Sequence, residues 1–233
     1  MNLFDACSGK TKRMNHVDRY STFPVLRKEN VAEHSWWVAF ISLLIAEDLR
    51  ARGKGADIHI DSLLRRALCH DLSEIISGDI IRSYKHTNPT VKAAMDEADA
   101  INMSELVAEY GESQDVILAA YTMAKDKRIE GQIVGFADLA CVAFYCRSEW
   151  LLGNKEIEPI LKDMYESWFY KYHEHDRLYR YADQMFPTRQ WHDMLSFRHG
   201  ELEPAWPGGI PIMPTRTEGA VSDHDWPSGE GTP

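Results

Sequence analysis

The sequence lacks several features, and each absence excludes a class of protein. No basic stretch followed by an apolar run lies near the first residue, so we expect no signal peptide. No run of about 18 uncharged apolar residues occurs, which argues against a membrane-spanning helix. The cysteines form no C-x-x-C pair and are too few for a disulfide scaffold: Cys7, Cys69, Cys141 and Cys146. We therefore predict a soluble protein of the reducing cytoplasm.

Common catalytic signatures and a basic surface are missing as well. The chain has no glycine-rich phosphate loop and no Ser-His-Asp signature, which argues against P-loop enzymes and serine hydrolases. Its formal net charge is −10, so we expect neither stable nucleic-acid binding nor binding to an anionic membrane. A small anionic substrate held by a few cations is compatible with this charge.

The apolar residues recur with helical spacing almost throughout the chain. Its 233 residues are 44% hydrophobic with a mean hydropathy of −0.40, as expected of one globular domain. We predict helices over residues 31–50, 61–76, 89–111, 113–124, 129–152 and 156–185. Asn30 with Glu33 predicts a capping box, Asp61 a helix cap, and Asn88 with Pro89 a helix start. Because no alternating strand pattern appears, the predicted fold class is all-α, a helical bundle.

The composition changes near residue 200. From about Glu201 the chain is a mixture of Pro, Gly, Ser and Thr that cannot bury enough apolar surface to offset its ordering entropy. We therefore predict one domain over residues 1–200 and an extended or disordered tail over residues 201–233. The aromatic residues between 165 and 181 are expected to pack in the core or between copies of the chain, which favours a homo-oligomer.

Four ionisable residues on separate apolar segments could surround one metal ion: His34, His70, Asp71 and Asp138. Two imidazoles and two carboxylates suit a divalent transition metal such as Co, Mn or Zn, with Mg as a further candidate. Each residue alone is more often a hydrogen-bonded core group than a ligand. Burying all four in an α-helical core without a counter-charge is costly, however, and a metal supplies that charge.

Two further carboxylates follow the His-Asp pair. Glu74 lies three residues after Asp71, one turn further along the predicted helix, where it could deprotonate a water. Asp79 follows Gly78 on a predicted loop and could reach a leaving group. Alone, each is more often a surface carboxylate or a turn residue, but beside the metal ligands we interpret both as catalytic, without assigning which is acid and which is base.

Taken together, these segments resemble a known family. The resemblance runs from about residue 15 to 155 and is carried by Arg19-Tyr20, the run from Arg27 to Ser35, His70-Asp71-x-x-Glu74, Gly78-Asp79 and Ala137-Asp138. These motifs are similar to those of the HD-domain phosphohydrolases, and within them to the bacterial 5'-deoxynucleotidase branch. The resemblance implies a helical bundle with its metal site in the core, an arginine at Arg19 that faces the substrate phosphate, and removal of the 5'-phosphate from deoxynucleoside monophosphates.

The chain also departs from that family's pattern. Tyr20 replaces a tryptophan that commonly shapes the sugar pocket, and Ile80-Ile81-Arg82 replaces a common Leu-Pro-Thr. If Arg82 and Lys85 contact further phosphates, the substrate would be a deoxynucleoside triphosphate, as for related phage enzymes that hydrolyse dATP. A solvent-facing arginine is the simpler interpretation. A non-catalytic nucleotide-sensing module is a third hypothesis, which the pairing of Glu74 with Asp79 argues against.

Overall fold

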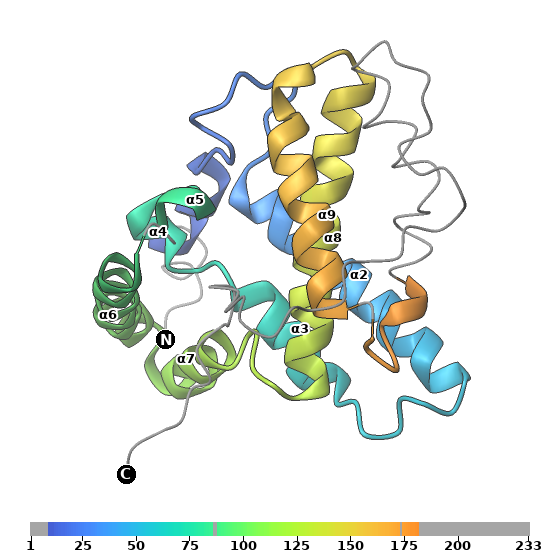
Figure 1. The fold of residues 1–233 in the computed structure, drawn as a ribbon. Helices are drawn as coiled ribbons and strands as arrows, with labels where there is room; N and C mark the ends of the chain where they lie inside the picture. Colours follow the sequence, from blue (N-terminus) through green and yellow to red (C-terminus); the bar gives the residue numbers. More distant parts are fainter. Residues whose placement is uncertain (1–8, 86–87, 173, 182–233) are drawn as a thin grey trace, which may run out of the picture. The chain divides into compact units, whose positions relative to one another are not determined.

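The computed structural model describes residues 9–85, 88–172 and 174–181, and these ranges form an all-α fold (Figure 1). Among them, extended pairing is limited to one isolated bridge between Asp18 and Asn30. The helices are η1 (Lys10–His16), α2 (Val31–Ala51), α3 (Ile60–Cys69), α4 (Glu74–Ser77), α5 (Arg82–Lys85), α6 (Pro89–Val107), η2 (Ala108–Ser113), α7 (Gln114–Thr122), α8 (Ile129–Leu151), η3 (Lys155–Ile157) and α9 (Glu158–Tyr172). The predicted fold class is therefore confirmed.

Two helix starts follow the local signals in the sequence. At the start of α2 the Asn30 side chain accepts a hydrogen bond from the Glu33 backbone, and the Glu33 carboxylate accepts one from the Asn30 backbone. At the start of α6 the Asn88 side chain accepts from the backbone of Val91, and Pro89 occupies the first turn. Both caps satisfy backbone N–H groups that have no partner within the helix.

The predicted cap at Asp61 is wrong. α3 begins one residue earlier, at Ile60, and its N-cap is His59. The reason is tertiary, because the His59 N–H donates to the carboxylate of Glu130, which is buried in the first turn of α8. Asp61 instead lies exposed in the first turn of α3, where its charge favours the helix N-terminus.

The predicted continuous helix from 61 to 76 is also wrong, since α3 ends at Cys69 and His70 is its C-cap. Beyond it, the Leu72 N–H donates to the Cys69 carbonyl and the Glu74 N–H to the Asp71 carbonyl, both with the i→i+3 spacing of a tighter turn. Residues three apart eclipse each other in such a turn, so Asp71 and Glu74 lie in register rather than on a regular α-helical face.

The C-terminal helix is shorter than the predicted span of 156–185. α9 ends at Tyr172, and the chain then turns at His175, whose Nδ1 accepts backbone N–H groups from Arg177 and Leu178. Two aromatic residues of α9 pack inward, since Trp168 is 5% exposed and Tyr172 is 1% exposed. The predicted tail over residues 201–233 and the boundary near residue 200 lie outside the described residues and stay predictions, as does the homo-oligomer.

The core of the bundle is built on α8. α2 and α3 pack against each other and against α8, and α9 runs beside α8 on another side (Figure 1). By length and composition α8 could cross a membrane, but 61% of its most apolar stretch is buried inside the protein, as in the core helix of a globular domain. The junction of α2, α3 and α8 therefore brings three distant parts of the sequence together.

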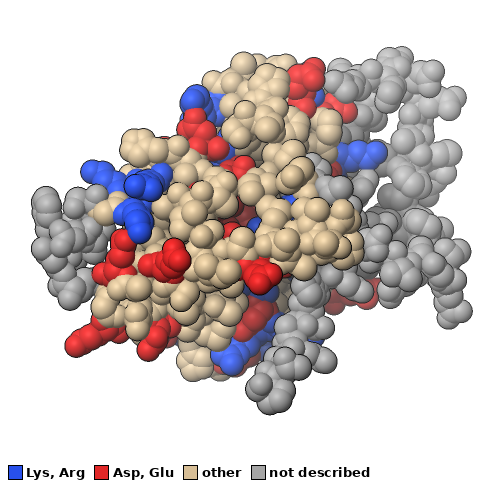
Figure 2. Space-filling model, turned by 90° about the vertical axis from the view of Figure 1, so that its left-hand side faces the viewer, with Lys and Arg blue, Asp and Glu red and all other residues tan. Residues whose placement is uncertain are grey.

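The surface on the α6 side of the molecule carries both kinds of charge. Figure 2 shows Lys and Arg side chains in separate groups on this face, with acidic and uncharged side chains between them. A continuous basic stripe, which a nucleic-acid backbone would require, is not seen among the described residues of this face.

Candidate metal centre

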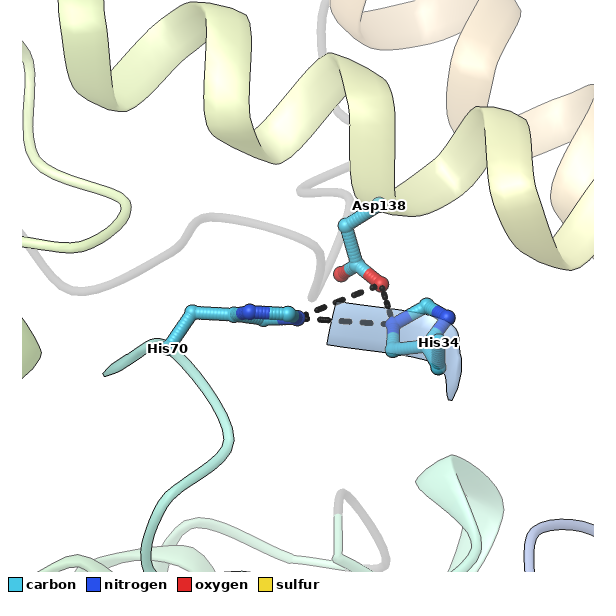
Figure 3. A group of neighbouring side chains, drawn as sticks. All are labelled: His34, His70 and Asp138. Atoms are coloured by element: carbon cyan, nitrogen blue, oxygen red, sulfur yellow. Dashed lines mark hydrogen bonds and ion pairs between the residues drawn. The ribbon is translucent and has the colours of Figure 1, made fainter. Parts of the chain in front are cut away.

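His34, His70 and Asp138 converge at the junction of the three core helices (Figure 3). His34 is on α2, His70 follows the last residue of α3, and Asp138 is on α8. The Nε2 atom of His34 lies 3.0 Å from Oδ1 of Asp138 and 3.4 Å from Nε2 of His70. His34 and Asp138 are 104 positions apart in the sequence, so their contact is a product of the tertiary fold.

The hydrogen bond made by Nδ1 of His70 determines the tautomer of the ring, and with it which nitrogen has a lone pair. Its Nδ1 donates to the carbonyl oxygen of Ala67 at 2.7 Å, so Nδ1 carries a proton. In the neutral ring Nε2 then has a lone pair, and that lone pair faces the carboxylate oxygen Oδ2 of Asp71 at 3.0 Å. This tautomer, with the Nε2 lone pair turned toward a carboxylate, is the one a metal ligand needs.

Asp71 completes the cluster from the side of His70. Its Oδ2 atom also lies 3.6 Å from Nε2 of His34. Ligand atoms that share an ion at bond lengths of about 2.1 Å are roughly 3.0–3.4 Å apart, which is close to the separations found between these side chains. The four residues predicted as ligands therefore lie together, and three of them, His34, His70 and Asp138, offer ligand atoms within 4.8 Å of one another.

His34 is held in the neutral form that a ligand requires. Burial, together with the positive charge of Arg19, lowers the pKa of His34 to about 4. The ring is fully buried, and its Nδ1 has no hydrogen-bond partner among the described residues. An imidazole that stays unprotonated down to such a pH competes little with protons for a metal.

A lysine that sequence reasoning missed lies beside Asp138. The Nζ atom of Lys125 donates to Oδ2 of Asp138 at 2.7 Å. Burial acts to raise the pKa of Asp138, but Lys125 and the two histidines outweigh it and hold that pKa well below the usual range. Within the sequence, Lys125 is one of two lysines in the loop between α7 and α8, so no local signal distinguishes it.

Arg19 approaches the same cluster from the segment that precedes α2. Its guanidinium is 9% exposed, with Nη1 3.4 Å from Oδ2 of Asp71 and Nε 3.6 Å from a carboxylate oxygen of Glu29. Its backbone N–H donates to the carbonyl of Glu29 at 2.9 Å, beside the bridge between residues 18 and 30. The predicted phosphate-binding arginine is therefore buried next to the metal cluster and fixed by both its backbone and its side chain.

The next residue, Tyr20, has a strained backbone. Its φ of 57° is in the left-handed region, which costs a non-glycine residue about 1–2 kcal/mol. Two contacts offset this strain: the Tyr20 N–H donates to Oδ2 of Asp79 at 3.1 Å, and its ring stacks on Tyr145 of α8 with 4.5 Å between ring centroids. Asp79 thus links the segment of Arg19 to the loop after α4.

The rest of this segment is anchored to the end of α8. The carboxylate of Glu149, which is 1% exposed, accepts the backbone N–H groups of Leu26 and Arg27 at 2.7 and 2.9 Å. It also accepts a bond from the Asn154 amide, which in turn donates to the carbonyl of Pro24. Glu149 and Tyr145 are positioning residues that the sequence did not reveal, because only packing brings α8 to residues 20–27.

Glu74 lies in the same charged environment as Asp71. Its Oε2 atom is buried and has no hydrogen-bond partner among the described residues. Burial, together with the negative charges of Asp71 and Asp79, raises the pKa of Glu74 well above the usual value for glutamate. A carboxylate of this kind is a better proton acceptor near neutral pH than an exposed glutamate.

The two cations predicted to contact further phosphates are placed differently. Lys85 is on α5, and its Nζ lies 3.6 Å from a carboxylate oxygen of Asp99 on α6, so its charge already has a partner. Arg82 begins α5, but its side chain lies outside the described residues. The hypothesis of a triphosphate site thus gains no support from Lys85.

The ionisation of Glu29 gives the stability of the folded protein a testable dependence on pH. Burial raises the pKa of Glu29 to about 7, although Arg19 opposes the shift, whereas an unfolded glutamate titrates near 4.3. Between these values the folded protein holds a proton that the unfolded chain lacks, so this contribution to stability is present at low pH and lost as the pH rises through 7. We expect Glu29→Gln, which is neutral at every pH, to gain several degrees in Tm relative to wild type between pH 5 and pH 8.

The measurement is thermal unfolding of both proteins across that pH range. Glu105→Gln is a matched control, because Glu105 is an exposed glutamate on α6 and is not among the charges that shift the pKa of Glu29. A difference in Tm between Glu29→Gln and wild type that does not change with pH would show that Glu29 is ionised throughout.

The sequence matches known proteins over most of its described length. Residues 9–184 match the model of a family described as 5'-deoxynucleotidase YfbR-like. A 5'-deoxynucleotidase of Vibrio vulnificus is 28% identical over 145 residues, which cover 62% of this chain and 74% of that relative.

Solved structures agree on the fold. An HD-domain phosphohydrolase of Listeria innocua has a TM-score of 0.69 at 20% identity, with 84% of this chain and 90% of that chain covered. The HD phosphohydrolase of cyanophage S-2L, solved with dA and one catalytic Zn²⁺ ion, has a TM-score of 0.50 at 15% identity and covers 80% of this chain and 95% of its own. With the family model spanning residues 9–184, the chain belongs to the 5'-deoxynucleotidase YfbR-like family and has the HD-domain fold.

Proposed function

We propose that this protein is a metal-dependent phosphohydrolase that removes the 5'-phosphate from deoxynucleoside monophosphates. The observation that carries the proposal is the cluster of His34, His70, Asp71 and Asp138, in which Nε2 of His70 lies 3.0 Å from Oδ2 of Asp71 beside a buried arginine. The names of the family and of its curated relatives support the substrate class. The nucleoside and the zinc ion in the cyanophage neighbour support a nucleotide pocket beside one metal.

In this proposal His34, His70, Asp71 and Asp138 hold the metal. A divalent ion there supplies Lewis acidity, which makes a water more acidic and withdraws charge from a phosphoryl oxygen. The nitrogen and oxygen ligands favour a transition metal such as Co, Mn or Zn over Mg, which prefers a shell of oxygen atoms.

We assign the role of general base to Glu74 and a positioning role to Asp79. Glu74 has a free buried oxygen atom and a raised pKa, so it is suited to take the proton from the attacking water. One oxygen of Asp79 accepts the Tyr20 N–H, which leaves its other oxygen for the leaving group or for the sugar. This assignment separates two carboxylates that the sequence alone left equivalent.

Arg19 is placed to bind the phosphate. Its guanidinium lies 3.4 Å from Asp71, and therefore next to the metal ligands, where it can stabilise negative charge on the phosphoryl oxygens. Tyr20 follows directly, and its ring is held in place by stacking on Tyr145, so the ring can form one fixed wall of a substrate pocket. We propose that this wall borders the sugar, in the position where the family commonly has a tryptophan.

Product analysis tests the proposed function. Purified protein is incubated with deoxynucleoside mono- and triphosphates in the presence of Mn, Co, Zn or Mg, and the phosphate released is identified. We expect orthophosphate from monophosphates, with monophosphates much the better substrates and with a chelator abolishing the reaction. Release of triphosphate from dATP as the main reaction would establish the triphosphohydrolase instead.

The non-catalytic sensor would give a different result in the same experiment. Nucleotides would raise the Tm of the protein without any phosphate release, whichever metal is present. The free oxygen atom and raised pKa of Glu74 favour an enzyme over this module, because binding a nucleotide does not require a proton acceptor.

A further inference from the structure

The two oxygen atoms of Asp138 have different partners. Oδ1 faces the cluster, 3.0 Å from Nε2 of His34 and 4.0 Å from Nε2 of His70. Oδ2 points the other way and accepts the ammonium group of Lys125 at 2.7 Å. Lys125 thus restrains the orientation of the carboxylate, since turning it out of its present plane would break a charge-assisted hydrogen bond.

The charges around Asp138 strengthen its contact with Lys125. Asp138 shares the site with Asp71, and their like charges repel each other, while Lys125 is attracted to both. The lysine is three-quarters buried, with a side chain that is 24% exposed, so water screens this interaction only partly.

The loop that carries Lys125 is itself fixed by a buried arginine. Arg66 of α3 is 1% exposed, and its Nη1 donates to the Asp126 carboxylate at 2.7 Å and to the carbonyl of Met123. Gly131 packs against the same loop so closely that a Cβ there would lie 2.5 Å from the Asp126 carbonyl oxygen. The loop therefore has little freedom, and Arg66, which supports it, lies on α3 four residues before His70.

We propose that Lys125 is a positioning residue for the metal centre, which holds Asp138 in the orientation that binds the ion and thereby sets the metal affinity. The inference rests on the proposed function, because it takes Asp138 as a ligand. Partners that bind the free oxygen or nitrogen of a metal ligand commonly change metal affinity by about 10- to 100-fold when they are removed.

The test compares Lys125→Met with Lys127→Met. Methionine keeps most of the length of the side chain and removes the charge, and Lys127 is an exposed lysine two residues away in the same loop. Affinity for Zn²⁺ and Mn²⁺ is measured by competition with a chromogenic chelator at fixed pH. We expect Lys125→Met to bind about 10- to 100-fold more weakly than wild type, Lys127→Met to match wild type, and added metal to restore the turnover of Lys125→Met.

Equal affinity in the two variants would overturn the proposal, as would a loss of turnover in Lys125→Met that saturating metal does not reverse. If Lys125→Met shows no cooperative thermal unfolding, the comparison is made with Lys125→Gln, for which weaker binding supports the proposal and unchanged binding overturns it. The metal affinity of the wild-type protein separates this proposal from the proposed function. A wild-type protein that binds neither Zn²⁺ nor Mn²⁺ would refute the metal centre itself.

Discussion

Asp71→Ala is expected to abolish both metal binding and activity. Its Oδ2 atom lies 3.0 Å from Nε2 of His70 and 3.6 Å from Nε2 of His34, so its removal opens the proposed metal site on one side. It also removes the carboxylate 3.4 Å from Arg19, and thus leaves that positive charge less well compensated beside the ion. A metal contributes several kcal/mol to such a transition state, so turnover should fall by at least about 1000-fold.

The measurement is metal content by elemental analysis together with phosphate release from a deoxynucleoside monophosphate. Asp61→Ala is a suitable control, because Asp61 is an exposed aspartate on α3 whose ion pair with Arg65 is at the surface. Asp61→Ala should keep both the metal content and the turnover of the wild-type protein. A metal-replete Asp71→Ala protein with near-normal turnover would refute the assignment of Asp71 as a ligand.

Glu74→Gln is expected to separate chemistry from metal binding. Glutamine keeps the shape of the side chain but cannot accept the proton of the attacking water, so kcat should fall by about 10²- to 10⁴-fold while the metal stays bound. The pH profile should change as well. Burial and the charge of Asp71 raise the pKa of Glu74, so the wild-type rate should increase as the pH rises through that raised value, and the variant should lack this limb.

Glu105→Gln, an exposed glutamate on α6, is the control for this substitution. Loss of metal in Glu74→Gln would place Glu74 among the ligands rather than at the base. Normal turnover with an unchanged pH profile would leave Asp79 as the remaining candidate for the base.

Local sequence predicted the helices well where their ends depend on neighbouring residues. The capping box of Asn30 with Glu33 and the Asn88-Pro89 start are of this kind, because the atoms that satisfy each other lie within one turn. The prediction failed where a distant group intervened. Glu130 of α8 moved the cap of α3 from Asp61 to His59, and a tighter turn ended that helix before Asp71.

The sequence by itself determined the all-α fold, the family and the chemical types of the proposed metal ligands, because periodicity, motif order and side-chain chemistry are all properties of the chain. Only the tertiary structure decided which groups surround those ligands. Lys125 beside Asp138 and Glu149 beneath the Arg19 segment are set by packing across the bundle. The pKa of His34 near 4 and the raised pKa of Glu74 likewise depend on burial and on charges from distant segments.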